Sequence, residues 1–179
     1  MTVGSSRKTI LCGALATALS GFLLGGTAQA APAAVPSETV VITNYAHSNY
    51  LIPDNGSGQP GTYLQVYYRA DHPFKRTFTF ERVGGQADIY KWRMADSGAC
   101  AESSGQAGTY VDVRNCTSNK NQWWEVRRVG NTSRWVLIPF LNEGVAVTGT
   151  FGDDNVAPLR ELPSPRDATA AQQWFLAPE

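Results

Sequence analysis

The chain has 179 residues, of which 42% are hydrophobic, and its 15 basic residues balance its 15 acidic residues. This length fits one domain with a core of its own. Charges of both signs are interspersed, which argues against nucleic acid as a partner. The two histidines lie far from the cysteines and no CxxC spacing occurs, so we expect neither a zinc site nor any other metal or cofactor.

The first 30 residues have the pattern of an export signal. Arg7 and Lys8 precede an apolar stretch that Gly and Ser interrupt, and Ala28 and Ala30 are the small residues that a signal peptidase reads. A membrane anchor is the alternative, but it would need roughly 20 uninterrupted apolar residues. We therefore predict a cleaved signal peptide over 1–30 and a secreted protein without a membrane span. The mature chain then has 13 basic and 15 acidic residues, a net charge of −2.

The mature chain begins with an Ala- and Pro-rich segment over 31–39 that lacks apolar periodicity, and we expect it to be a flexible lead. From residue 40 to residue 179 no amphipathic helix is indicated. Short alternating runs rich in Val, Thr and aromatic residues predict strands, and Gly-, Asn- and Pro-bearing turns separate them. These runs cover residues 40–43, 62–68, 77–83, 109–115, 123–129 and 134–140. The pattern favours an all-β sandwich or barrel.

An internal repeat decides between these two architectures. Gln122 and Trp124 in "NQWWEV" have the same spacing as Gln172 and Trp174 in "AQQWFL", and Phe78 in "KRTFTF" takes the aromatic place in an earlier copy. The three aromatic residues are 46 and 50 residues apart. A unit of that size cannot bury its apolar face alone, so three copies predict a threefold barrel with a cap.

A second motif supports the same repeat. "GTYLQVY" at Gly61 aligns with "GTYVDVR" at Gly108 and, more loosely, with "VAPLREL" at Val156. Cys12 leaves with the signal, and the remaining pair, Cys100 and Cys116, is an even count in an oxidising compartment. We predict that this pair forms a disulfide; two buried free thiols are the alternative.

The second copy, "CAESSGQAGTYVDVRNCTSNKNQWWEV", resembles a repeat of the ricin B-type lectins. The third copy resembles it less, and the first departs further, with Arg76 and Phe78 in place of Gln and Trp. The resemblance implies an all-β fold, a β-trefoil with three degenerate repeats over 40–179, and a carbohydrate-binding role. The binding subunits of cytolethal distending toxins are similar. In such a trefoil the Trp of each motif enters the shared core, and the Gln ties neighbouring turns together.

The resemblance also implies where a sugar would bind. In the second copy the acid position is Glu102, the strand position is Asp112, the stacking position is Arg114, and the amides are Asn121 and Gln122. Glu replaces the usual Asp, and Arg114 replaces an aromatic residue, although a guanidinium can also lie flat on a ring.

The other two copies are less complete. The first keeps Gln65 and Tyr67 as candidate carbohydrate-binding residues, but Ile52 takes the acid position and Lys75 the amide position. The third has no acid, aromatic residue or Asn in these places. Its residues there are Val147, Arg160, Leu162 and Ala171. A solvated trefoil surface is the alternative for every copy.

We expect no enzymatic activity, because the sequence has no GxSxG, HExxH or Gly-rich phosphate loop. Asp153 and Asp154 are typical of a solvated turn, and His47 and His72 of loops. The predicted partner is a glycan on a cell surface or in a polysaccharide. The alternative is a protein partner, as in a protease inhibitor or a toxin-binding subunit, which would be contacted through loops such as 54–61 or 151–158.

Overall fold

The computed structural model describes residues 34–56, 58–67, 77–150 and 156–179. Several sequence predictions fall outside these residues and are not addressed by the structure: the signal peptide over 1–30, His72, Lys75, Arg76, Asp153 and Asp154. In the part of the chain that is described, no helix has the length and apolar character needed to cross a membrane.

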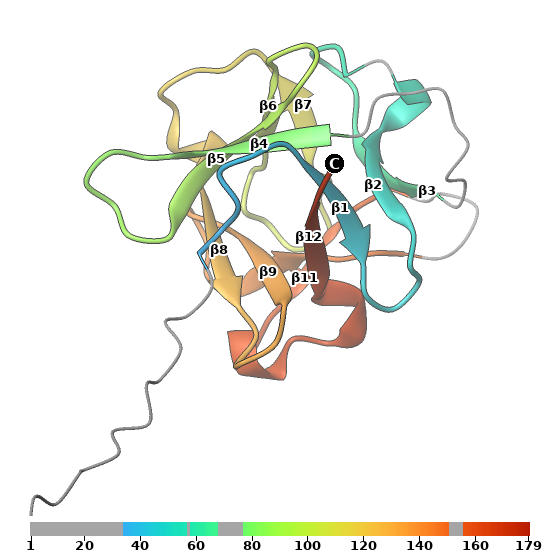
Figure 1. The fold of residues 1–179 in the computed structure, drawn as a ribbon, viewed down its shortest axis with the longest axis vertical. Helices are drawn as coiled ribbons and strands as arrows, with labels where there is room; N and C mark the ends of the chain where they lie inside the picture. Colours follow the sequence, from blue (N-terminus) through green and yellow to red (C-terminus); the bar gives the residue numbers. More distant parts are fainter. Residues whose placement is uncertain (1–33, 57, 68–76, 151–155) are drawn as a thin grey trace, which may run out of the picture. The chain divides into compact units, whose positions relative to one another are not determined.

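Six antiparallel strands form a closed barrel (Figure 1). Each strand pairs with two neighbours, and the pairing of β1 with both β12 and β4 completes the ring. In order around the barrel the strands are β1 (Val40–Asn44), β4 (Thr77–Arg82), β5 (Ile89–Met94), β8 (Trp124–Arg128), β9 (Arg134–Pro139) and β12 (Trp174–Pro178).

Three two-stranded hairpins accompany the barrel, one in each repeat. They are β2 (Tyr50–Pro53) with β3 (Leu64–Tyr67), β6 (Cys100–Glu102) with β7 (Asp112–Arg114), and β10 (Val145–Val147) with β11 (Leu159–Glu161). Short 3₁₀ helices lie between strands: η1 (Asp54–Gly56), η2 (Lys120–Gln122), η3 (Pro165–Asp167) and η4 (Ala170–Gln172). A six-stranded barrel with three hairpins is a β-trefoil, so the predicted fold class is confirmed.

The three hairpins meet in a ring of hydrogen bonds around the threefold axis. Leu64 N donates to Val111 O at 2.8 Å, Val111 N to Ala157 O at 3.3 Å, and Ala157 N to Leu64 O at 2.9 Å. All three residues are fully buried. The ring therefore identifies the equivalent residues of the three repeats, and it confirms the alignment of the first two copies.

The same ring corrects the alignment of the third copy by two residues. Ala157, not Leu159, occupies the place of Val111. The error arose because the third copy lacks the Gly-Thr-Tyr marker, and because a slip of two residues leaves the alternation of buried and exposed positions unchanged.

Indole hydrogen bonds give an independent check of this register. Trp124 Nε1 donates to Ala101 O at 3.0 Å, and Trp174 Nε1 donates to Val147 O at 3.1 Å, so Val147 matches Ala101. In the third repeat the four site positions are therefore occupied by Thr148, Pro158, Arg160 and Ala171, in place of Val147, Arg160, Leu162 and Ala171. This copy still supplies no acid, aromatic residue or Asn.

Aromatic residues fill the barrel as expected. Trp124 and Trp174 have no exposed surface, and Phe78 is 1% exposed. Trp92 of β5, which the sequence patterns did not single out, is also fully buried, and its ring lies 4.7 Å from that of Trp124. Burial of such large apolar rings is a main source of stability for the shared core.

A disulfide joins Cys100 and Cys116, which confirms the predicted pair and excludes two free thiols. It ties the first residue of β6 to the segment that follows β7. Closing a loop of this size stabilises a fold by about 3 kcal/mol in the chain-entropy model. The hairpin of the second repeat is therefore held at its open end.

Candidate functional site

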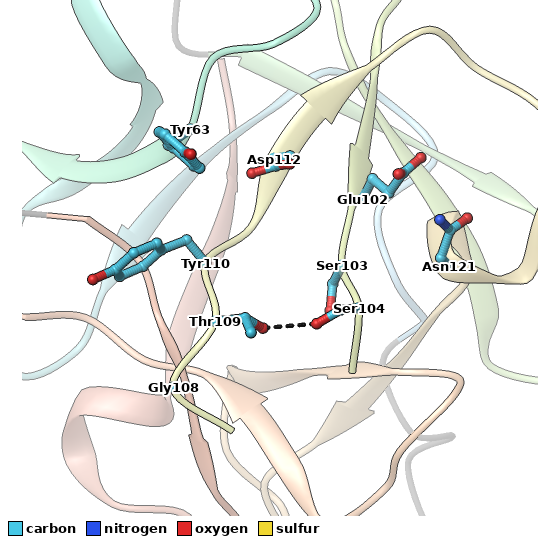
Figure 2. Close-up of a pocket in the computed structure, with 9 residues that line it drawn as sticks. All are labelled: Tyr63, Glu102, Ser103, Ser104, Gly108, Thr109, Tyr110, Asp112 and Asn121. Carbon is cyan, nitrogen blue, oxygen red and sulfur yellow. Dashed lines mark hydrogen bonds between the residues drawn. The ribbon is translucent and has the colours of Figure 1, made fainter. Parts of the chain in front are cut away.

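The β6–β7 hairpin borders an open pocket with a volume of about 490 Å³ (Figure 2). This volume is within the range of ordinary small-molecule sites. The lining residues are Tyr63, Glu102, Ser103, Ser104, Gly108, Thr109, Tyr110, Asp112 and Asn121. In the view of Figure 2, the two tyrosines lie on one side of the pocket and Glu102 with Asn121 on the other.

Strand register brings the key side chains to one face. Glu102 of β6 is directly opposite Asp112 of β7, and Asp112 is in turn bridged to Tyr63, which precedes β3. Paired residues in antiparallel strands project to the same face of a sheet, with Cβ atoms about 4.5–5.5 Å apart. Tyr110 is on that face too, since it is two residues before Asp112. The sequence reasoning thus grouped Glu102, Asp112 and Asn121 correctly in space, and the structure adds the tyrosines.

Glu102 is held in place by Gln122. Gln122 Nε2 donates to Glu102 Oε2 and to Asn115 O, both at 2.8 Å, and Gln122 Oε1 accepts from Thr117 N at 2.7 Å. Gln122 has no exposed surface. The expectation that Gln122 touches a sugar is therefore corrected, because its buried amide groups are occupied and it positions the carboxylate instead.

Asn121 lies on η2, next to the strand that carries Glu102. Its carbonyl oxygen accepts a hydrogen bond from Ser103 N at 2.9 Å, which fixes η2 against the end of β6. Its side-chain Oδ1 is buried and has no hydrogen-bond partner within the described residues. Leaving a buried acceptor unsatisfied costs about 1–3 kcal/mol. Four other described residues, none of them in the lining of this pocket, also have a buried side-chain atom without a partner, so this feature does not by itself mark a site.

Asp112 and Arg114 form an ion pair on the exposed side of β7. Arg114 Nη2 donates to Asp112 Oδ2 at 2.7 Å, and this hydrogen bond, with the charge of Asp112, raises the pKa of the Arg114 guanidinium. Arg114 is not among the residues that line the pocket. The lining therefore does not include the guanidinium that we expected to provide a flat contact surface. It includes the rings of Tyr63 and Tyr110.

The loop between β6 and β7 contributes hydroxyl groups and is rigidly held. Ser104 Oγ and Thr109 Oγ1 are 2.9 Å apart (Figure 2), and Ser103 Oγ accepts from Gly105 N at 2.9 Å. Gly105 has a φ of +73°, a conformation that favours glycine. Asn142 of the third repeat donates to Gly105 O at 2.8 Å. The pocket is therefore formed before any ligand binds.

The sequence reasoning missed Tyr63 and Tyr110. Both are exposed, at 45% and 43%, and their rings form an edge-to-face pair with centroids 5.8 Å apart. A signal existed, because Gly-Thr-Tyr recurs in the first two copies with the tyrosine at the same place. A repeated aromatic residue that is exposed and not part of the core suggests a contact with a ligand.

The first repeat places its candidates differently. Gln65 and Tyr67 lie half-buried on β3. Opposite Gln65 is Ile52, which is 3% exposed, where the second repeat pairs Glu102 with Asp112. The described part of this repeat therefore offers no carboxylate at the equivalent position.

No family model and no curated protein matches the chain. Solved structures do match it. The designed threefold symmetric protein ThreeFoil aligns with a TM-score of 0.65 and 17% identity, over 79% of this chain and 99% of its own. The Rhizoctonia solani agglutinin aligns with a TM-score of 0.64 and 15% identity, over 83% of this chain and 100% of its own.

A third match is the Polyporus squamosus lectin, which was solved with the epitope Neu5Acα2-6Galβ1-4GlcNAc. It aligns with a TM-score of 0.62 and 19% identity, over 78% of this chain and 48% of its own. At these identities the likeness shows the fold alone, a β-trefoil of the kind that lectins have. It agrees with the fold implied by the resemblance to ricin B-type lectins, whereas a closer relation to toxin subunits stays a prediction.

Proposed function

We propose that this protein is a secreted carbohydrate-binding protein without catalytic activity, and that its glycan site is the pocket of the second repeat. One observation carries the proposal: Glu102, fixed by Gln122, lines the same open pocket as Asp112 and Asn121. The β-trefoil fold, which is shared with lectins, supports the same function.

The chemistry of the pocket suits a sugar. Each hydroxyl of a saccharide loses hydrogen bonds to water on binding and needs a protein partner in return. Glu102 and Asp112 supply acceptors, Asn121 supplies an amide, and Ser104 and Thr109 supply hydroxyls that can donate or accept. Because these groups are held by β6, β7 and η2, little conformational entropy is lost when a ligand orders them.

The test is a glycan array followed by titration calorimetry with the glycan that binds best. Glu102→Ala removes a charge-assisted hydrogen bond worth about 1.5–3 kcal/mol, so we expect at least about a tenfold loss of affinity. Asn121→Ala should weaken binding in the same direction. Glu161→Ala is the control, since Glu161 is an exposed carboxylate on β11 of the third repeat.

The outcomes separate the candidate functions. If affinity survives Glu102→Ala and Asn121→Ala but falls with Tyr67→Ala, the first repeat contains the site. If no glycan on the array binds, the carbohydrate-binding proposal is wrong and a protein partner becomes the leading alternative.

A further inference from the structure

We propose that Tyr63 and Tyr110 together form the apolar contact surface of this site, so that two repeats share it, and that the site selects uncharged glycans. The inference rests on the proposed glycan-binding function and extends it. Tyr63 belongs to the first repeat, whereas Glu102, Tyr110, Asp112 and Asn121 belong to the second, so a pocket confined to one repeat would lack one of its aromatic walls.

The backbone around Tyr63 is fixed to the second repeat. Val113 N donates to Thr62 O at 2.8 Å, and Leu64 N donates to Val111 O at 2.8 Å. Tyr63 therefore lies between two hydrogen bonds that join the repeats. These backbone hydrogen bonds hold Tyr63 beside β7 in the folded protein, so ligand binding is not needed to bring it there.

The rings of these two tyrosines are unusually exposed. Among the described residues, four large hydrophobic side chains are exposed: Tyr45, Tyr63, Tyr110 and Leu141. Two of them, Tyr63 and Tyr110, line this pocket. The planes of the Tyr63 and Tyr110 rings are 75° apart. In an edge-to-face pair the face of one ring is covered by the edge of the other, and the remaining faces stay available. The electron-rich face of an aromatic ring attracts the C–H groups on the apolar side of a pyranose.

The charges of the pocket decide which sugars fit. Glu102 and Asp112 are both in the lining, and the lining includes no lysine or arginine. Arg114 is outside the lining, but its guanidinium interacts with both Asp112 and Glu102, so the two carboxylates and this one cation together carry a net charge of −1. A sialic or uronic acid would bring its carboxylate toward like charges, which costs free energy and suppresses binding. An uncharged glycan avoids this repulsion and can donate hydroxyl hydrogen bonds to both carboxylates.

The experiment compares uncharged oligosaccharides with derivatives that carry one added acidic sugar. Lactose is compared with 3′-sialyllactose, and xylotriose with xylotriose that carries glucuronic acid, alongside an array of further uncharged oligosaccharides. Calorimetry with the uncharged oligosaccharide that binds best then compares the wild type with Tyr63→Ala, Tyr110→Ala and Tyr63→Phe. We expect each alanine variant to lose about tenfold in affinity, and Tyr63→Phe to keep most of it because the ring remains.

Tyr45→Ala is the matched control. Tyr45 is 42% exposed and its ring makes an edge contact with Phe175, as Tyr63 does with Tyr110, but Tyr45 does not line the pocket. Its removal should leave affinity unchanged. Circular dichroism of each variant checks that the fold is intact.

The results distinguish this inference from the function on which it rests. If Glu102→Ala abolishes binding while Tyr63→Ala does not change it, the shared site is overturned and the glycan-binding function stands. Acidic probes that bind as tightly as their uncharged partners would overturn the selection by charge. If no probe binds the wild type, both the function and this inference are wrong.

Discussion

At the scale of single residues, two glutamines with the same structural role differ in one contact. Gln172 Oε1 accepts from Thr169 N at 3.1 Å and Gln172 Nε2 donates to Glu161 O at 2.9 Å, which matches the backbone contacts of Gln122 in the second repeat. The second acceptor of Gln122 Nε2 is the carboxylate of Glu102 at 2.8 Å, whereas that of Gln172 Nε2 is the backbone carbonyl of Arg160 at 3.5 Å. A residue that stabilises the fold in two repeats therefore also orients a candidate binding group in one of them.

This difference gives a paired prediction. Gln122→Ala and Gln172→Ala should each lower the free energy of unfolding by about 1–3 kcal/mol, because each removes a buried side chain that is hydrogen-bonded to part-buried backbone groups. Only Gln122→Ala should also weaken glycan binding, since Glu102 loses the amide that holds it. Denaturant melts measure the first effect and calorimetry the second. Equal losses of affinity in the two variants would show that Gln122 acts on binding through stability alone.

At the scale of elements, strand alternation decides which side chains stabilise the barrel. Trp124 begins β8 and is fully buried, whereas Trp123 precedes the strand and is only partly buried. The ring of Trp123 packs against Phe140 at 5.4 Å, and the Lys120 ammonium lies 5.9 Å from its centroid. Two adjacent tryptophans thus belong to different environments, one in the core and one at the surface.

We predict that Trp124→Ala and Trp174→Ala each cost about 3–5 kcal/mol, as deletion of a buried aromatic ring does. Trp123→Ala should cost clearly less, because part of its surface already faces water. Urea denaturation of the three variants measures the difference. The register assigned to β8 would be wrong if Trp123→Ala were the most damaging of the three.

At the scale of the whole molecule, the three repeats are nearly symmetric in their packing. Among the described residues, however, only the second repeat has a complete set of candidate site residues. The cyclic hydrogen bonds of Leu64, Val111 and Ala157 show that the three repeats pack alike. Their surfaces have nevertheless diverged, because Ile52 and Thr148 stand where the second repeat has Glu102. Core positions must keep the fold, whereas surface positions are free to change without loss of stability.

For the exported protein we predict a chain that begins at Ala31. The bond after Ala30 follows the apolar stretch and the small residues that a signal peptidase recognises. Intact mass spectrometry of the form in the culture medium measures the start directly. Recovery of a chain that retains Met1 in the membrane fraction would contradict both the cleavage and the proposed secretion.

Much of this protein was readable from local patterns. Alternation predicted β1, β3, β4, β7, β8 and β9, because a strand that buries one face imposes a period of two on its own residues. It missed β6 and β10, which have three residues each and are too short to show a period, and it also missed the longer strands β5 and β12. Within one repeat, spacing was also sufficient to group Glu102, Asp112 and Asn121, since all three lie on one hairpin and the turn beside it.

The features that could not be predicted from the sequence depend on contacts between repeats. Asp112 is bridged to Tyr63 of the first repeat. Alternation within a strand cannot predict such a pairing, because the two residues are far apart in the chain. The register of the third repeat was lost for the same reason, because a slip of two residues preserves alternation and only the bonds around the threefold axis distinguish the two alignments. The aromatic side of the pocket therefore exists only once the three repeats have packed together.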